Sequence, residues 1–379
     1  MIKQNSLYVP ALRLKAGELL GLASLAPDVA DRTLPRLIVP PRKERDKETQ
    51  QTLMSLEDVP NAGQLLSRFW RGRRAILDST YLVDDFGIKK MGIWLPKMFE
   101  VARREQIDAI PMASLDDLLG AQAAAFRSAV MIDMSPQLFI RIPSDQLVGP
   151  EALSLLSRAL ERVGLAPNDC SVIADFSDSD FSQPEIVADI IQGVLELLQD
   201  AGRWQQIVFQ GTNFPEKNPA EPSSFELVPR NEWKAWKLAV KFDPNTAEHF
   251  VFGDYGADCA KMVFNGSGGR AIRHYRYTTE DAWLVQRGAS TGCDADVMRE
   301  VCRQIVSKKE FAGQSLSQAD VYIYNTYIGR EGPGNSTTWR AINTTHHITR
   351  VVNDIGAVKK IQFQRSPVEE NATQETMDF

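Results

Sequence analysis

The sequence lacks several features that would place a protein in a class at once. It contains no apolar stretch near the roughly 18 residues that a membrane-spanning helix needs. Its first residues, 1–5, lack the charged start and apolar run of a secretory signal peptide. We therefore expect a cytoplasmic protein that does not contact a membrane.

Cysteine is also scarce, and the charge balance is mildly acidic. The four cysteines are Cys170, Cys259, Cys293 and Cys302, and no two of them have the Cys-x-x-Cys spacing of a metal site. We expect all four to be reduced and structural. The sequence leaves the metal and cofactor requirements of the protein unknown. A net charge of −6 argues against a general nucleic-acid binder, although a local basic patch is compatible with it.

What the sequence does contain is an alternation of short apolar runs with helical patterns. The runs are Leu7–Leu12, Pro35–Val39, Arg74–Asp78, Asp108–Met112, Leu138–Ile142, Ser171–Asp175, Gln206–Gln210 and His249–Asp254. Strand–helix repetition predicts a parallel sheet covered by helices, and eight strands close such a sheet into a barrel. The predicted fold is therefore α/β, a (β/α)8 TIM-like barrel. Such a barrel takes ~250 residues, so a chain of 379 has room for additions.

The pattern changes after the eighth run. Two extended runs predict a β-hairpin inserted at about 270–288, and Asp294–Ser307 resembles the eighth barrel helix. Further helices are expected within about 319–355. We interpret residues 1–365 as a single barrel domain with these additions, and 366–379 as a disordered acidic tail.

Polar residues near the strand ends are the candidates for chemistry, because active sites of this fold lie at the carboxyl ends of the strands. The candidate catalytic residues are Asp78, Arg141, Asp175 and Asp254. We expect Asp175 and Asp254 to share one cavity. Converging carboxylates could bind Mg²⁺ or act as acid and base; alternatively, they cap the following helices or pair with nearby cations.

A wider set of residues is expected to bind ligand around the same mouth. They are Lys15, Glu18, Gln210, Asn213, Tyr255, Arg276, Arg340, Asn343 and His347. Arg340, Asn343 and His347 are three and four apart, so they share a helical face. Arg276 belongs to a hairpin that mixes arginine with Tyr275, Tyr277 and Trp283. That mixture predicts either a lid over the barrel mouth or a surface that stacks bases and pairs phosphates.

Two stretches resemble a known family. The segment Tyr8–Glu18, and the segment from Ser336 to Thr349 with its Thr-Trp-Arg and His-His-Ile-Thr motifs, resemble the opening and closing motifs of the beta family proteins of phages and bacteria. The resemblance implies no established reaction. The family's association with phages and mobile elements implies a role in phage–host conflict, as anti-phage defence or counter-defence.

Two functions follow as hypotheses. In the first, the barrel mouth binds a small or nucleotide-like anionic ligand, which the protein hydrolyses or senses. In the second, the barrel is a non-catalytic scaffold that binds nucleic acid or a protein partner through the arginine-aromatic hairpin. Whether the protein is an enzyme stays uncertain from the sequence.

Overall fold

The structure of the chain is a computed structural model, and it describes residues 6–44, 59–132, 135–242, 250–262, 264 and 273–361. The hairpin residue Arg270 and the predicted acidic tail lie outside the described residues.

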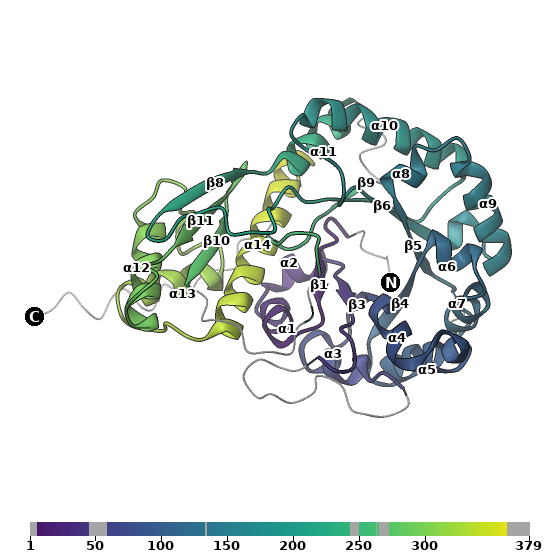
Figure 1. The fold of residues 1–379 in the computed structure, drawn as a ribbon, viewed down its shortest axis with the longest axis horizontal. Helices are drawn as coiled ribbons and strands as arrows, with labels where there is room; N and C mark the ends of the chain where they lie inside the picture. Colours follow the sequence, from purple (N-terminus) through teal and green to yellow (C-terminus); the bar gives the residue numbers. More distant parts are fainter. Residues whose placement is uncertain are drawn as a thin grey trace, which may run out of the picture.

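Eight parallel strands form the barrel and confirm the predicted fold class (Figure 1). They are β1 (Ala11–Arg13), β2 (Arg36–Ile38), β3 (Arg74–Asp78), β4 (Asp108–Ser114), β5 (Leu138–Pro143), β6 (Cys170–Asp175), β7 (Ile207–Gln210) and β9 (Phe250–Gly253). Their order in the sheet follows the chain. The segment before β1 closes the circle, since the Val9 and Ala11 amides donate to the carbonyls of Phe252 and Asp254. Each of the eight predicted apolar runs overlaps one of these strands.

Helices cover the outside of the sheet. They are α1 (Ala16–Ala23), α2 (Pro27–Asp31), α3 (Ala62–Trp70), α4 (Val83–Phe86), α5 (Met91–Arg104), α6 (Leu115–Leu119), α7 (Ala123–Val130), α8 (Ser144–Leu147), α9 (Ala152–Val163), α10 (Pro184–Ala201), α11 (Asn231–Phe242) and α14 (Ser336–Val358), with 3-10 turns at Thr80–Leu82, Ile88–Lys90 and Pro167–Asp169. In α9 the residues that bury one face of the helix and end it can be named. Leu156, Leu160 and Val163 form its buried stripe, and Gly164, with a φ of 70°, ends it in the left-handed conformation that favours glycine.

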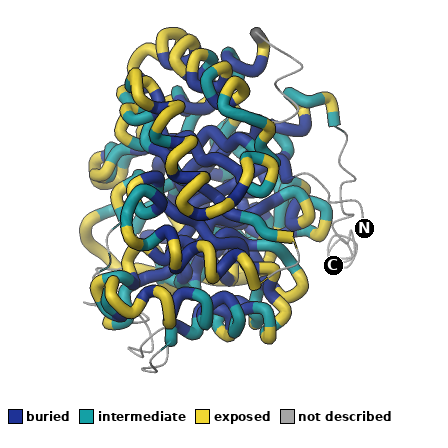
Figure 2. Tube along the Cα trace, turned by 90° about the vertical axis from the view of Figure 1, so that its right-hand side faces the viewer, coloured by how far each residue is buried: buried dark blue, intermediate teal, exposed yellow. Residues whose placement is uncertain are grey.

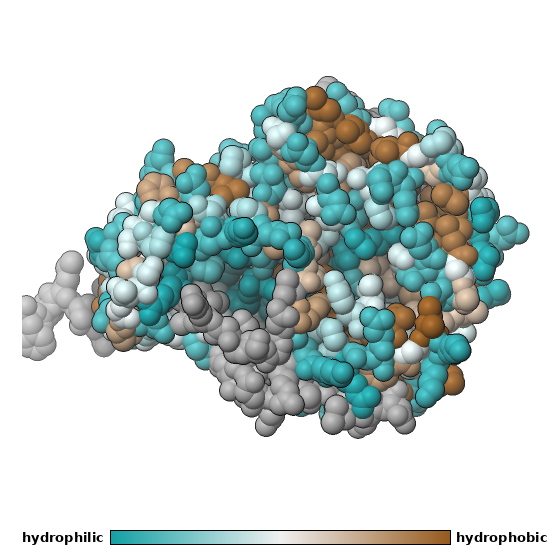
Figure 3. Space-filling view, viewed as in Figure 1, coloured by the Kyte–Doolittle hydropathy of each residue, from teal (hydrophilic) through white to brown (hydrophobic). Residues whose placement is uncertain are grey.

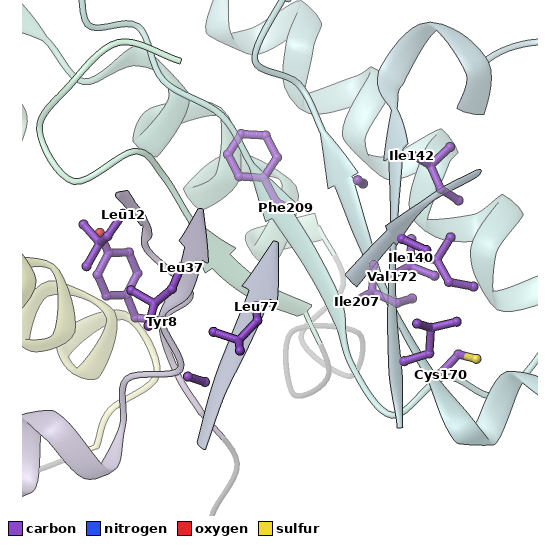
Figure 4. Close-up of a cluster of buried hydrophobic side chains, with 14 of the residues drawn as sticks. Tyr8, Leu12, Leu37, Leu77, Ile140, Ile142, Cys170, Val172, Ile207 and Phe209 are labelled. Carbon is purple, nitrogen blue, oxygen red and sulfur yellow. The ribbon is translucent and has the colours of Figure 1, made fainter. Parts of the chain in front are cut away.

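The strands bury both of their faces, because the side chains alternate between the barrel interior and the helix layer. Val9, Ile76, Ile173, Val208 and Val251 belong to the inner cluster. The residues between them point outward into the larger core under the helices, as Figure 4 shows. The labelled examples on the strands include Leu37, Leu77, Ile140, Val172 and Phe209.

The helix that completes the barrel differs from the prediction. The expected helix at Asp294–Ser307 exists as α12 (Asp294–Val306), but its buried residues pack with those of β10 and β11 instead of the barrel strands. The long C-terminal helix α14 takes the place beside α1, and its Ile348, Val351 and Val352 belong to the main barrel core. Local periodicity predicts a helix, but it does not say which sheet that helix covers.

Beside the barrel lies a second assembly, here called the side lobe. It consists of β8 (Phe225–Pro229), β10 (His274–Thr278), β11 (Ala282–Arg287), α12 and α13 (Gln318–Tyr327). The predicted hairpin is present as β10 and β11, and β8 pairs antiparallel with β11 to give the order β10-β11-β8. In Figure 1 these strands lie to one side of the barrel, across α14. The role of the hairpin as a lid over the mouth stays a prediction.

A close approach of two helices positions the C-terminal helix. A Cβ atom added to Gly17 would lie 2.6 Å from Arg340 Cβ, and one added to Gly21 would lie 2.6 Å from Thr344 Cβ. These distances are shorter than side-chain contacts allow, so the two glycines let α1 and α14 pack backbone to backbone. Arg340 is thereby held near the end of β1.

The molecular surface carries both polar and apolar regions. Figure 2 shows the buried residues gathered in the interior and the exposed ones on the outer helices. In Figure 3 apolar residues gather over α10, where Ile186 and Ile190 are exposed, while polar residues cover most of the rest of that view. Within the described residues, no helix is long and apolar enough to cross a membrane.

Candidate functional site

A cavity of about 480 Å³ opens where the barrel strands end. Such volumes are typical of small-molecule sites. Its lining consists of Arg36, Ile38, Asp78, Thr80, Tyr81, Arg141, Ser177, Asp178, Thr212, Phe214, Glu216, Tyr255, Cys259, Ala260, Lys261 and Met262. These residues come from β2, β3, β5 and the segments after β6, β7 and β9, so the cavity belongs to the barrel mouth predicted from the sequence.

One side of the cavity is formed by a buried network around Arg36. Its Nε and Nη2 donate to Asp78 Oδ2 at 3.3 and 2.8 Å, and its Nη1 donates to Gln210 Oε1. The Thr80 hydroxyl and amide donate to the other Asp78 oxygen. Burial alone would raise the pKa of Asp78, but Arg36 and these hydrogen bonds outweigh it and lower that pKa below its ordinary value. Asp78 is therefore an ionised acceptor.

A second pair contributes a cation to the cavity. Arg141 Nε donates to Asp175 Oδ2 at 2.5 Å, and the Tyr255 hydroxyl donates to Asp175 Oδ1 at 3.3 Å. The Ser177 amide also donates to this carboxylate, whose side chain is 1% exposed. Burial, followed by the charge of Asp175, raises the pKa of Tyr255 to about 12, so its hydroxyl stays a donor near neutral pH. Arg141 is 29% exposed, so it faces the cavity while Asp175 lies behind it.

Asp254 does not join this cavity, which corrects the expectation that it meets Asp175 there. Strand alternation explains the difference: Val251 points into the barrel, so Asp254 points outward toward α14. Its carboxylate accepts from the Tyr8 hydroxyl and contacts His347 Nε2 at 2.9 Å. Burial opposes ionisation, but His347 and these hydrogen bonds hold the pKa of Asp254 below its usual value. His347 Nδ1 reaches the Thr278 hydroxyl at 2.8 Å, so this buried network joins the barrel to the side lobe.

A third group, here called the three-arginine cluster, lies next to the cavity. Asp258 Oδ2 contacts Arg13 at 3.0 Å and Arg340 at 2.9 Å, while its Oδ1 contacts Arg276 at 2.6 Å. Glu18 accepts from Arg13 at 2.9 Å and lies 3.9 Å from Arg340. Burial would raise the pKa of Asp258, but the three guanidiniums outweigh it and hold that pKa far below its ordinary range.

The remaining predicted ligand-binding residues are bound to protein partners or lie elsewhere. Lys15 pairs with Glu44, and the Asn213 amide donates to the Pro229 carbonyl at 3.1 Å. Gln210 is fully buried beneath the cavity. Asn343 lines a separate small cavity between β10 and α14.

The structure therefore brings five predicted residues to the mouth cavity or its immediate support. Asp78, Arg141 and Tyr255 line it, Asp175 holds two of them, and Gln210 accepts from Arg36 beneath it. Sequence reasoning missed Arg36, although it has the same inward parity on β2 as Leu34. It also missed Asp258, which follows a strand end by several residues and carries no local signal that would reveal three arginine partners.

The hairpin's aromatic residues are not available for stacking. Tyr275, Tyr277 and Trp283 are all buried. Tyr275 packs on Tyr277 and on Trp339 of α14, and Trp283 packs on Phe214 of the cavity lining. Of the hairpin arginines, Arg276 binds Asp258 and Arg287 donates to the Ala220 carbonyl at 2.9 Å.

The described residues contain no group of three or more histidine, cysteine, aspartate or glutamate side chains arranged to hold a metal ion. All four cysteines are free, as expected, and Cys170 and Cys302 are buried. The arrangement can offer a small ligand guanidinium, carboxylate and phenol groups.

Comparison with known proteins agrees with the two stretches of resemblance. No curated protein matches the sequence. The sequence profile of the Beta protein family matches residues 8–353. That range spans every barrel strand, the side lobe and most of α14, so it covers the mouth cavity and the three-arginine cluster. The chain therefore belongs to the Beta protein family.

Proposed function

We propose that the barrel mouth binds a small, nucleotide-like anionic ligand, with Arg141 as its anchor. The observation that carries this proposal is the position of Arg141. Only its Nε bonds to a described residue, Asp175, while its side chain is partly exposed in a cavity of about 480 Å³. Asp175 fixes the guanidinium through Nε, which leaves the two terminal nitrogens of Arg141 to bond an oxyanion.

The other groups of the cavity suit the rest of such a ligand. Tyr81, whose side chain is exposed, supplies aromatic surface against which a base can pack. Both oxygens of ionised Asp78 already accept from Arg36 and Thr80, and the Tyr255 hydroxyl donates to Asp175, so these two groups hold Arg36 and Asp175 in place at the cavity wall. The lowered pKa of Asp78 also makes this carboxylate a weak general base.

The experiment is a thermal-shift and calorimetric screen of nucleoside monophosphates, with the matching nucleosides as uncharged controls. We expect a monophosphate to raise the Tm of the wild type and its nucleoside to bind at least about tenfold more weakly, since charge-assisted bonds contribute ~1.5–3 kcal/mol. Arg141→Ala should abolish that difference. The matched control is Arg158→Ala, which removes an exposed arginine of α9 on the outer wall.

Two outcomes separate the roles that the ligand can have. Release of inorganic phosphate from the bound monophosphate by the wild type, lost in Arg141→Ala, assigns hydrolysis. Binding without turnover assigns sensing. Equal affinity in the wild type and Arg141→Ala would overturn the proposed anchor.

A role in anti-phage defence or counter-defence stays a prediction of the family resemblance. Plaque counts on host cells that express the wild type, Arg141→Ala or Arg158→Ala test it. We expect any effect of the wild type on plaque number to be lost only in Arg141→Ala.

A further inference from the structure

A second, much smaller cavity lies between the side lobe and the C-terminal helix. Its lining consists of His274, Tyr275, Arg276, Trp339, Arg340 and Asn343. The first three belong to β10 and the last three to α14. Arg340 and Asn343 are three apart and share a helical face, so they meet the same side of β10. None of these six residues lines the mouth cavity.

Asn343 is the residue that the fold leaves unexplained. It is 6% exposed, and neither its amide nitrogen nor its amide oxygen has a hydrogen-bond partner among the described residues. A buried polar group without a partner is destabilising, so buried amides are nearly always paired. A leucine would fill a similar volume without this cost. The position is explained if a bound group completes the hydrogen bonds of the amide.

The charge of the surroundings indicates what that group is. Arg13, Arg276 and Arg340 share only Glu18 and Asp258 among the described residues, which leaves three positive charges against two negative ones. The lowered pKa of His274 is consistent with a positive electrostatic potential in this cavity. Burial, and then the repulsion of Arg276 and Arg340, lowers that pKa to about 4. The cavity therefore favours an anion and disfavours a cation.

We propose that this cavity is a second site, separate from the barrel mouth, that binds a phosphate-class oxyanion. Asn343 and the guanidiniums of Arg276 and Arg340 are its donors. The volume is about 30 Å³, and a single water needs roughly 10–15 Å³, so the cavity admits an oxyanion but no nucleoside. The oxyanion is either free phosphate or the phosphate group of a larger ligand whose remainder stays outside. The inference does not depend on the ligand proposed for the mouth.

The test is calorimetric titration of the full chain with inorganic phosphate, in parallel with AMP. The variants are Asn343→Asp, which places a negative charge in the cavity, and Asn343→Leu, which removes the amide at similar volume. Arg141→Ala reports the mouth site. We expect Asn343→Asp and Asn343→Leu to weaken phosphate binding at this site by about tenfold or more, Arg141→Ala to keep this site while removing any phosphate bound at the mouth, and the control Arg158→Ala to leave both unchanged. Nuclear magnetic resonance of the four histidines gives an independent readout, in which bound phosphate raises the titration midpoint of His274.

The results separate this proposal from the first one. AMP that competes with inorganic phosphate in Arg141→Ala identifies a phosphate monoester as a source of the bound group, whereas phosphate binding without such competition identifies the free ion. Phosphate binding that is lost in Arg141→Ala and kept in both Asn343 variants assigns the ion to the mouth and overturns the second site. Equal affinity in the wild type and the Asn343 variants, or no phosphate binding at all, overturns it as well. If Asn343→Asp fails to fold, Asn343→Leu and the His274 signal decide.

Discussion

Replacing Asp258 with alanine is the sharpest test of how the three-arginine cluster holds the end of the barrel. The carboxylate contacts Arg276 at 2.6 Å, Arg340 at 2.9 Å and Arg13 at 3.0 Å. Its removal leaves three guanidiniums close together with only Glu18 to balance them among the described residues. The variant therefore combines lost ion pairs with new repulsion.

The size of the effect follows from burial and charge count. Removing one partner of a fully buried ion pair costs ~3–5 kcal/mol, and because Asp258 is 16% exposed we expect roughly 2–4 kcal/mol of unfolding free energy for Asp258→Ala. Arg340→Ala should cost less, about 1–2 kcal/mol, because it leaves two arginines facing two carboxylates. We expect the double variant to recover part of the loss.

Urea unfolding of the wild type, both single variants and the double variant measures these free energies. A coupling of at least ~1 kcal/mol between the two positions is expected, since they are in direct contact. Equal losses in the single variants, or strictly additive losses in the double variant, would refute the charge-balance reasoning.

The pH dependence gives the same prediction a second check. The folded-state pKa of Asp258 is lowered, so its stabilisation is present above the unfolded-state pKa of ~3.9 and is lost as pH falls toward the folded-state value. The difference between wild type and Asp258→Ala should be constant near neutral pH and shrink below about pH 4.

Three further predictions address other parts of the molecule. Gly21→Ala should lower stability by ~1–3 kcal/mol through overpacking of α1 on α14, whereas Gly193→Ala, with open space around its Cβ, should not lower it; thermal melting compares the two. Tyr8→Phe removes a donor from buried Asp254 and should cost ~1.5–3 kcal/mol in urea unfolding, and an unchanged midpoint would contradict the network. His274 has a pKa of about 4 when folded against ~6.5 unfolded, so stability should fall as pH drops between these values; His274→Gln should remove that slope, measured by melting at pH 7 and pH 4.5.

The elements near the mouth show how far sequence reasoning reaches. Asp78, Arg141 and Tyr255 were predicted from their places at strand ends, and all three line the cavity. Asp254 was predicted by the same rule but points to the outside of the barrel. The prediction did not use the alternation of side chains along a strand. A residue three positions after the inward Val251 points to the opposite face, the outside of the barrel. Counting parity from the inward apolar residues would also have identified Arg36.

Contacts between residues that are far apart in the sequence could not be predicted in this way. Asp258 meets Arg13 and Arg340, which are 245 and 82 positions away in the chain. The outer position of α14 depends on the glycines of α1, where the absence of side chains permits close approach. Neither feature leaves a periodic signal.

The sequence by itself determined the eight strands, most of the helices and the end of the barrel at which polar groups gather. It could do so because side-chain alternation, apolar stripes and helix-ending glycines act over a few residues. Only the tertiary structure decided that α14 rather than α12 covers the barrel, that β8 joins the hairpin in a side lobe, and that three arginines share Asp258. Those outcomes depend on how sequence-distant surfaces fit and how their charges balance once the barrel has closed, and no local pattern carries that information.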